Sequence, residues 1–236
     1  MVNSIRPFHE IGDVLGPTVR LFFRNFWLIT KIVVVIVAPF EVFKTLKFAD
    51  LADNSQLAVG IVVLDGMCRV LIAPALIYAL MQVMQTGIAP GVNESYRWGV
   101  SKLGKLIICA ALAFILEALG IVLCVIPGIV IHLSLILVYP IAILEQVSAT
   151  GALNSSHNMT KGHRWNILFT SIILWLLVML FLLPEQVAES LVLADSGLWP
   201  LHVAAAILSD IMEQSMTVLS LVIYLSIRAL WSQRTQ

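Results

Sequence analysis

Hydrophobic residues dominate six long stretches of this chain, and polar residues gather in the short segments between them. A helix that crosses the hydrocarbon core of a bilayer needs about 20 mostly apolar residues. The stretches that reach this length are residues 26–45, 57–83, 105–126, 129–147, 166–184 and 204–231. The pattern therefore predicts an all-α polytopic membrane protein with six transmembrane helices, folded as a single membrane domain over residues 1–236.

Composition agrees with this class and narrows the possible functions. Hydrophobic residues make up 60% of the 236 residues and charged residues only 12%, whereas an average soluble domain is about 25% charged. The six spans use nearly the whole length, so we expect no soluble catalytic domain. The formal net charge is zero, which gives no support to a nucleic-acid partner. The cysteines lie in apolar runs without metal-site spacing, so we predict no metal and no cofactor.

The sequence Ile-Pro-Gly interrupts the longest apolar run. One helix from Leu106 to Leu144 would be roughly 58 Å long, about twice a hydrocarbon core of ~30 Å. Pro127 lacks an N–H group and disfavours helix at the residue before it. Gly128 tolerates the positive φ of a tight turn. We therefore expect Pro127 and Gly128 to form a hairpin turn between the third and fourth spans. A re-entrant break within the membrane is the alternative.

Basic residues indicate the orientation of the spans. Cytoplasmic segments of membrane proteins carry an excess of Lys and Arg. In the six-span arrangement one side carries only Lys44 and Lys47, and the other carries Arg6, Arg20, Arg24, Arg97, Lys102, Lys105, Lys161, Arg164, Arg228 and Arg234. The asymmetry places both termini in the cytoplasm.

Three segments on the basic side have amphipathic character. Residues 1–25 contain the stretch "IGDVLGPTVRLFF", whose apolar residues follow helical spacing, so we expect a helix that lies in the membrane interface before the first span. The stretches "NESYRWGVSKLGK" and "SATGALNSSHNMTKGHRW" are weaker examples. Ser148 or Thr150 is expected to cap the helix in the last of these.

Ionisable residues at membrane depth are the candidate functional residues. Asp65 and Arg69 lie four residues apart on the second span and share a helix face. Glu117 lies at a similar depth on the third span, so we expect the three side chains to form a cluster. Such residues cost about 2.5–3.5 kcal/mol each on insertion and persist where they are paired or line a path. Two interpretations stay open, namely a structural ion pair and a polar site for a solute, a proton or a lipid headgroup.

Three stretches resemble a group of bacterial multipass membrane proteins. They are "IRPFHEIGDVLGPTVRLFFRNFW", "VIPGIVIHLSLILVYPIAILE" and "ALNSSHNMTKGHRWNIL". The group includes the YciC-like proteins and the membrane domain ahead of the catalytic domain in some glycerophosphodiester phosphodiesterases. The positions that match its motifs are Pro140, Glu145, Ala152, Leu153, Ser156, Thr160 and Gly162. Asn154-Ser155 stand where relatives usually carry a basic residue before the serine. The resemblance implies a six-helix domain of the bacterial inner membrane.

These observations favour a non-enzymatic function. No Ser/His/Asp order, phosphate loop or metal-spaced histidine cluster appears in the sequence. We expect an accessory or scaffold subunit that packs against another membrane protein in a larger complex or organises membrane lipids. The alternative is a small transporter or permease-like protein that uses the Asp65, Arg69 and Glu117 cluster. A lipid-active enzyme has the least support.

Overall fold

The computed structural model describes residues 8, 10–46, 55–123, 125–194 and 198–234, and no strand occurs among them. The helices in these ranges are α1 (Ile11–Arg24), α2 (Phe26–Leu46), α4 (Ser55–Thr86), α5 (Val92–Val100), α6 (Leu103–Leu123), α7 (Val125–Leu135), α8 (Val138–Leu144), α9 (Ala149–Thr160), α10 (Arg164–Ala194) and α11 (Trp199–Arg234). The all-helical class expected from the sequence is therefore confirmed.

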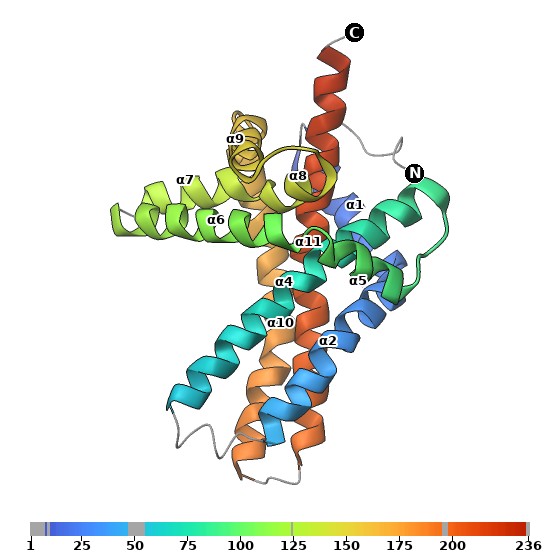
Figure 1. The fold of residues 1–236 in the computed structure, drawn as a ribbon, viewed down its shortest axis with the longest axis vertical. Helices are drawn as coiled ribbons and strands as arrows, with labels where there is room; N and C mark the ends of the chain where they lie inside the picture. Colours follow the sequence, from blue (N-terminus) through green and yellow to red (C-terminus); the bar gives the residue numbers. More distant parts are fainter. Residues whose placement is uncertain (1–7, 9, 47–54, 124, 195–197, 235–236) are drawn as a thin grey trace.

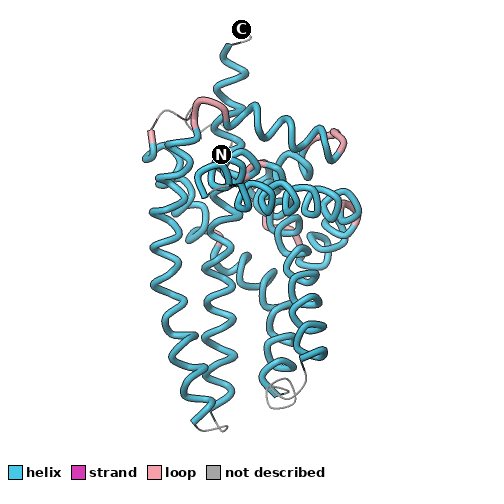
Figure 2. The backbone as a smooth tube through the Cα atoms, turned by 90° about the vertical axis from the view of Figure 1, so that its left-hand side faces the viewer, coloured by secondary structure: helices cyan, strands magenta, loops and turns pink. Residues whose placement is uncertain are grey.

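The helices form two groups with different directions. The long helices α2, α4, α10 and α11 run alongside one another as a bundle, while α6 and α7 lie across one end of it (Figure 1). Figure 2 shows the same long helices from the side. Within the bundle, α11 packs against α10, α2 and α4, and every residue from Val218 to Ile227 is buried. We therefore regard α11 as the central helix of the protein.

Several helices have the length and composition needed to cross a membrane. Within the described ranges these segments are Phe26–Thr45, Leu103–Val122, Ile126–Leu144, Arg164–Ala188 and Trp199–Trp231. They are consistent with a multipass membrane protein. The described apolar part of α4 is shorter and covers Val70–Thr86. The six predicted stretches are largely helical where the structure describes them. They are not six parallel spans, because α6 and α7 lie across the bundle (Figure 1).

The helices α6 and α7 lie side by side and run in opposite directions (Figure 1). Their contact is close at two glycines. A Cβ atom added to Gly120 would lie 3.0 Å from the Cα atom of Gly128, and one added to Gly128 would lie 3.2 Å from the backbone nitrogen of Ile121. Such distances are below normal contact, so glycine at both positions lets the two backbones approach.

The expected role of Pro127 and Gly128 needs correction. Both residues belong to the first turn of α7, which begins at Val125, and Gly128 does not have a positive φ. The first turn of a helix accepts proline because its N–H groups have no intrahelical acceptor. Gly128 is thus required for close helix packing rather than for a left-handed turn.

The predicted fourth span, residues 129–147, is also interrupted. The helix α7 ends at Leu135 and α8 begins at Val138, and Glu145 after α8 is extended. Pro140, four residues after Ile136, is the local signal for this break, because its nitrogen has no hydrogen to donate to the Ile136 carbonyl and its ring clashes with that group.

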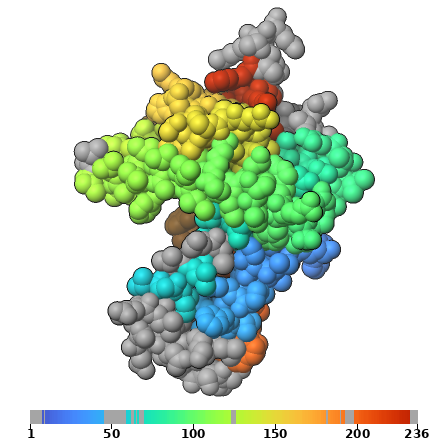
Figure 3. All heavy atoms as spheres, viewed as in Figure 1, coloured from blue at the N-terminus to red at the C-terminus, as the bar shows by residue number. Residues whose placement is uncertain are grey.

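Two shorter helices on the expected polar segments are confirmed as helices. The first, α1, buries Val14, Thr18, Leu21 and Phe22 on one face and packs against α11. In α9 the hydroxyl of Ser148 accepts a hydrogen bond from the backbone N–H of Gly151 at 3.1 Å, which confirms Ser148 as a capping residue. The helix α9 packs on both α6 and α7, and together they form a wide ledge over the narrower bundle (Figure 3).

Candidate functional site

A buried serine stabilises the break between α7 and α8. The hydroxyl of Ser156, on α9, donates to the carbonyl oxygen of Ser134 at 2.7 Å and accepts from the backbone N–H of Leu137 at 3.3 Å. Ser156 is fully buried. Because a broken helix leaves backbone groups without intrahelical partners, this one side chain replaces two of the missing bonds. It also fixes α9 to the end of α7.

A second set of polar contacts joins α8 to the central helix. The Tyr224 hydroxyl donates to the Glu145 carboxylate at 2.8 Å, and an Arg228 N–H donates to the same hydroxyl at 2.7 Å. From α6, the Lys105 ammonium donates to the backbone carbonyl of Glu145 at 3.0 Å. These contacts connect α6, α8 and α11. Tyr224 is fully buried, so its hydroxyl offers little access to a ligand. We call Lys105, Glu145, Ser156, Tyr224 and Arg228 the polar joint.

Residues singled out by sequence resemblance lie in or next to the polar joint. Glu145 and Ser156 belong to it, and Pro140 is buried in α8, which ends just before Glu145. The Thr160 hydroxyl donates to the carbonyl of Ser156 at 2.9 Å. Gly162 has φ +91° in the turn between α9 and α10, a conformation that side chains other than glycine rarely adopt. The geometry gives these motif positions a structural role, because they hold the ledge to the bundle.

The joint contains three residues that sequence reasoning did not place in a site. Tyr224 and Arg228 are four residues apart on α11 and therefore share a face. Lys105 was used only to predict the orientation of the spans. The sequence signal that could have identified Tyr224 and Arg228 was their spacing of four residues within a largely apolar stretch.

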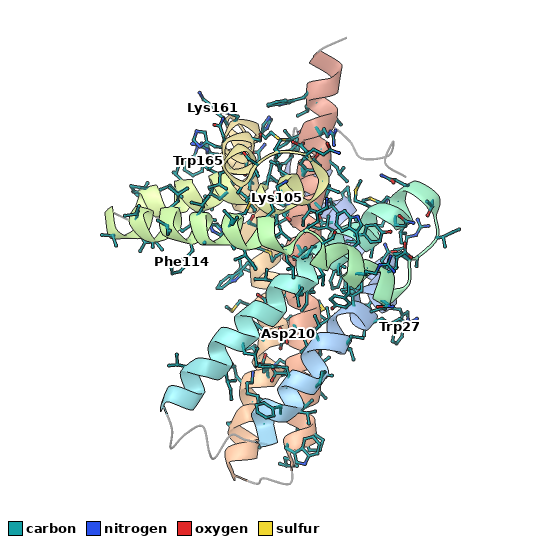
Figure 4. All side chains as sticks on the ribbon, viewed as in Figure 1. Trp27, Lys105, Phe114, Lys161, Trp165 and Asp210 are labelled. Carbon is teal, nitrogen blue, oxygen red and sulfur yellow. The ribbon has the colours of Figure 1, made fainter. Side chains whose placement is uncertain are left out.

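A cavity with a polar wall lies where α8 meets the bundle, and Ser220 in its wall is one helical turn from Tyr224 of the polar joint. It has a volume of about 260 Å³ and lies between α4, α8 and α11. Its polar wall is a stripe along α11, formed by Glu213, Gln214, Thr217 and Ser220, and Tyr139 lines it from α8. The Thr217 hydroxyl donates to the Gln214 side chain at 3.2 Å. Asp210 is buried one turn before Glu213 on the same helix, inside the bundle (Figure 4).

Of the predicted cluster of Asp65, Arg69 and Glu117, the structure describes only the side chain of Glu117. Glu117 instead accepts from His132 of the neighbouring helix α7, with 3.0 Å between Oε1 and Nδ1. Asp65 and Arg69 are both on α4, but their side chains lie outside those that the structure describes. A contact between Glu117 and Arg69 therefore stays a prediction, and the observed partner of Glu117 is a histidine.

One buried acid escaped the sequence analysis. Glu41 lies on α2 with its side chain only 1% exposed, and Lys44 donates to it at 2.7 Å. One residue further on, the Thr45 hydroxyl lies 3.2 Å from Nδ1 of His202 on α11. These contacts connect α2 and α11 at the end of the bundle opposite the joint. An acid within an apolar run was the signal for Glu41.

The short helix α5 packs tightly on α4. A Cβ atom added to Gly99 would lie 3.2 Å from the backbone nitrogen of Ala75. On the other side the Tyr96 hydroxyl donates to the carbonyl oxygen of Ile32 in α2. Burial raises the pKa of Tyr96 above its ordinary value, because the phenolate form would lose its hydration. The helix therefore joins α4 to α2.

Comparison with models of known protein families, with characterised proteins and with solved structures finds no match to this chain. The resemblance to the YciC-like group stays a prediction from short motifs. In the parts of the chain that the structure describes, no three His, Cys, Asp or Glu side chains are grouped so that they could hold a metal ion.

Proposed function

We propose that this protein is a non-enzymatic subunit of the bacterial inner membrane that packs against another membrane protein through the antiparallel pair α6–α7. In this arrangement α2, α4, α10 and α11 span the bilayer, both termini face the cytoplasm, and α6–α7 lies at the cytoplasmic boundary of the hydrocarbon layer. The single observation that carries the proposal is the apolar surface of α6–α7, which projects beyond the bundle.

The exposed side chains of this pair are large and apolar. Phe114 is 73% exposed, Val122 84% and Ile126 74%. Phe114 lies on the side of α6 opposite α9 (Figure 4), and α9 covers part of the pair with a helix that also carries exposed polar residues such as Asn154 and Asn158. A surface that is polar on one side and strongly apolar on the other fits the boundary between water and a membrane, and contiguous apolar patches mark interaction sites.

The length of α11 supports this depth. Tyr224 lies 25 residues after Trp199 (224 − 199 = 25), which corresponds to about 37 Å along the helix. A hydrocarbon core is about 30 Å thick. If Trp199 marks the outer interface, the Tyr224–Glu145 contact lies just beyond the hydrocarbon layer on the other side. The helices joined there, α6 and α8, lie at the cytoplasmic boundary.

Photo-crosslinking in intact cells tests the partner. A photoreactive phenylalanine analogue is introduced at Phe114 or at Val122 on the projecting pair, and at Leu180 of α10 as a control. Leu180 is 64% exposed and belongs to a spanning helix. We expect both α6 positions to give the same discrete protein adduct, and Leu180 to give lipid adducts only.

Two results would oppose the proposal. Lipid adducts alone at Phe114 and Val122 would mean that the ledge contacts bilayer and not protein. A crosslink to a second copy of this chain would replace an accessory function by self-association. Both results are read by mass spectrometry of the purified adducts.

The polar cavity supports a second candidate function, a small transporter. A volume of about 260 Å³ is many times the ~10–15 Å³ of such space that a single water molecule needs. Polar groups that line a water-filled space within a membrane bundle often mark a solute or proton path.

Cysteine accessibility separates this candidate from a dry polar core. In a background without Cys68, Cys109 and Cys124, Thr217→Cys is treated with a small charged thiol reagent, and Leu219→Cys, on a fully buried position of the same helix, is the control. A transporter requires that Thr217→Cys reacts and that an external solute protects it. Reaction at neither position would exclude a water-filled cavity.

A further inference from the structure

A second cavity lies between α4 and α5, on the surface near the end of the bundle that carries the ledge. Its volume is about 500 Å³, and it is lined by Tyr78, Asn93, Glu94, Arg97, Trp98 and Ser101. We call it the headgroup pocket. It is separate from the polar joint, from the bundle cavity and from the exposed surface of α6–α7, so it is independent of the proposed function.

Two stacked aromatic rings form the rigid part of the headgroup pocket. The ring centroids of Tyr78 and Trp98 lie 4.8 Å apart with an interplanar angle of 24°. The Lys102 ammonium lies 5.6 Å from the Trp98 centroid. Tyr and Trp concentrate at the level of lipid headgroups because their rings are apolar and their polar atoms need water. The stack therefore indicates that the pocket lies at headgroup depth.

The pocket carries opposite charges on one helix. Glu94 and Arg97 are three residues apart on α5, and both are exposed. The Tyr78 hydroxyl donates to Oε1 of Glu94 at 2.7 Å and so orients the carboxylate. A carboxylate has about four lone-pair sites, so one donor leaves capacity for a cationic ligand. Arg97, with five N–H donors, is suited to phosphate recognition.

We propose that the headgroup pocket binds the headgroup of phosphatidylethanolamine. The Arg97 guanidinium and the Asn93 amide donate to the lipid phosphate, and Glu94 accepts from the primary ammonium group. A phosphate with an ammonium group two carbons away matches a site with one cation and one anion, and charge-assisted hydrogen bonds give the recognition its strength.

The neighbouring groups favour this headgroup over two common others. A phosphatidylglycerol headgroup has no cation for Glu94, so the carboxylate opposes its negative charge. A choline group has no N–H donors and binds by contact with aromatic faces. One face of Trp98 is covered by Tyr78, and Lys102 also lies near the ring, so an aromatic cage for choline is not available.

Lipid titration of the full-length protein tests the proposal. The purified chain in detergent micelles is titrated with phosphatidylethanolamine, phosphatidylglycerol or phosphatidylcholine of identical acyl chains, and bound lipid is counted by native mass spectrometry. We expect the tightest binding for phosphatidylethanolamine. Glu94→Gln should weaken it about tenfold, because one charge-assisted bond is lost, and should leave phosphatidylglycerol binding equal or stronger. Arg97→Gln should weaken the binding of all three lipids.

The matched control is Lys161→Gln, which removes an exposed positive charge at the end of α9 and should change nothing. Tyr78→Phe is a second variant that removes only the hydroxyl that orients Glu94, and it should reduce the preference for phosphatidylethanolamine over phosphatidylcholine.

Three outcomes would overturn the proposal. Equal binding of all lipids in every variant would remove the site, and a preference for phosphatidylglycerol that survives Glu94→Gln unchanged would assign it to anionic lipids. Displacement by soluble phosphoethanolamine or inorganic phosphate at equal potency would assign it to a soluble phosphate compound.

Discussion

The substitution Ser156→Ala tests the polar joint at its most buried point. The Ser156 hydroxyl satisfies one backbone carbonyl and one backbone N–H at the break between α7 and α8, at 2.7 Å and 3.3 Å. Alanine leaves both groups buried without this partner. An unsatisfied buried group costs about 1–3 kcal/mol, and the longer bond contributes at the low end of that range. We therefore expect the free energy of unfolding to fall by about 2–4 kcal/mol.

The control for this variant is Ser134→Ala. Ser134 is also buried, but its hydroxyl donates to the carbonyl of Val130 one turn earlier in α7, at 2.6 Å. Such bonds back to the preceding turn add little to helix stability, so its loss should change the free energy of unfolding by no more than about 0.5 kcal/mol.

Equilibrium unfolding by sodium dodecyl sulfate in mixed micelles, followed by tryptophan fluorescence, measures both variants. Equal effects of Ser156→Ala and Ser134→Ala would refute the reasoning, because they would show that the break does not depend on the Ser156 hydroxyl. A large loss for Ser134→Ala alone would place the important contact within α7.

Four further substitutions test other contacts. Leucine at Gly120 or at Gly128 should reduce the free energy of unfolding by similar amounts, at least the ~1–3 kcal/mol typical of overpacking, because each glycine faces the other helix at close range. Thermal unfolding of both variants measures this. A loss of stability for the Gly128 variant alone would favour the original prediction that Gly128 is a turn residue. Tyr224→Phe should cost about 1.5–3 kcal/mol in the same assay, because Glu145 loses the hydroxyl that contacts it, and a neutral effect would mean that the joint does not stabilise the fold. Tyr96→Phe should cost about 1 kcal/mol near pH 7 and less at higher pH. The pKa of Tyr96 is raised in the fold, so the wild type loses stability as pH rises above the unfolded pKa of about 10. The variant has no phenol at this position and does not lose stability in this way. A constant difference in unfolding free energy between the two proteins from pH 7 to 11 would contradict this.

Hydropathy predicted the helices because each apolar stretch is long enough to be recognised without knowledge of its neighbours. The direction of α6 and α7 was not predictable in the same way. A helix that crosses the membrane and one that lies along its boundary need similar composition when a partner or lipid covers the exposed side. The basic residues do not distinguish the two arrangements either. Arg97 before the pair and Lys161 after it lie on the same side of the membrane whether α6 and α7 cross the bilayer and return or lie along its boundary.

The polar joint was predictable only in part. The resemblance drew attention to Glu145 and Ser156, but their partners, Ser134 and Tyr224, are 22 and 79 residues away along the chain. Pro140 was a local signal for the break after α7, but the group that stabilises the break, the Ser156 hydroxyl, comes from α9 and has no local signal. The contact of Glu117 with His132 was missed for a related reason, since it depends on the packing of α7 on α6.

The orientation of α6–α7 is the central claim, and labelling at its tip tests it most directly. In a background without native cysteines, Val122→Cys at the far end of α6 and Leu201→Cys at the start of α11 are exposed to a membrane-impermeant maleimide added outside intact spheroplasts. Both side chains are exposed. We expect Leu201→Cys to be labelled and Val122→Cys to remain unlabelled, because both ends of α6 then lie on the cytoplasmic side. Labelling of both from the outside would show that α6 crosses the membrane and would contradict the account.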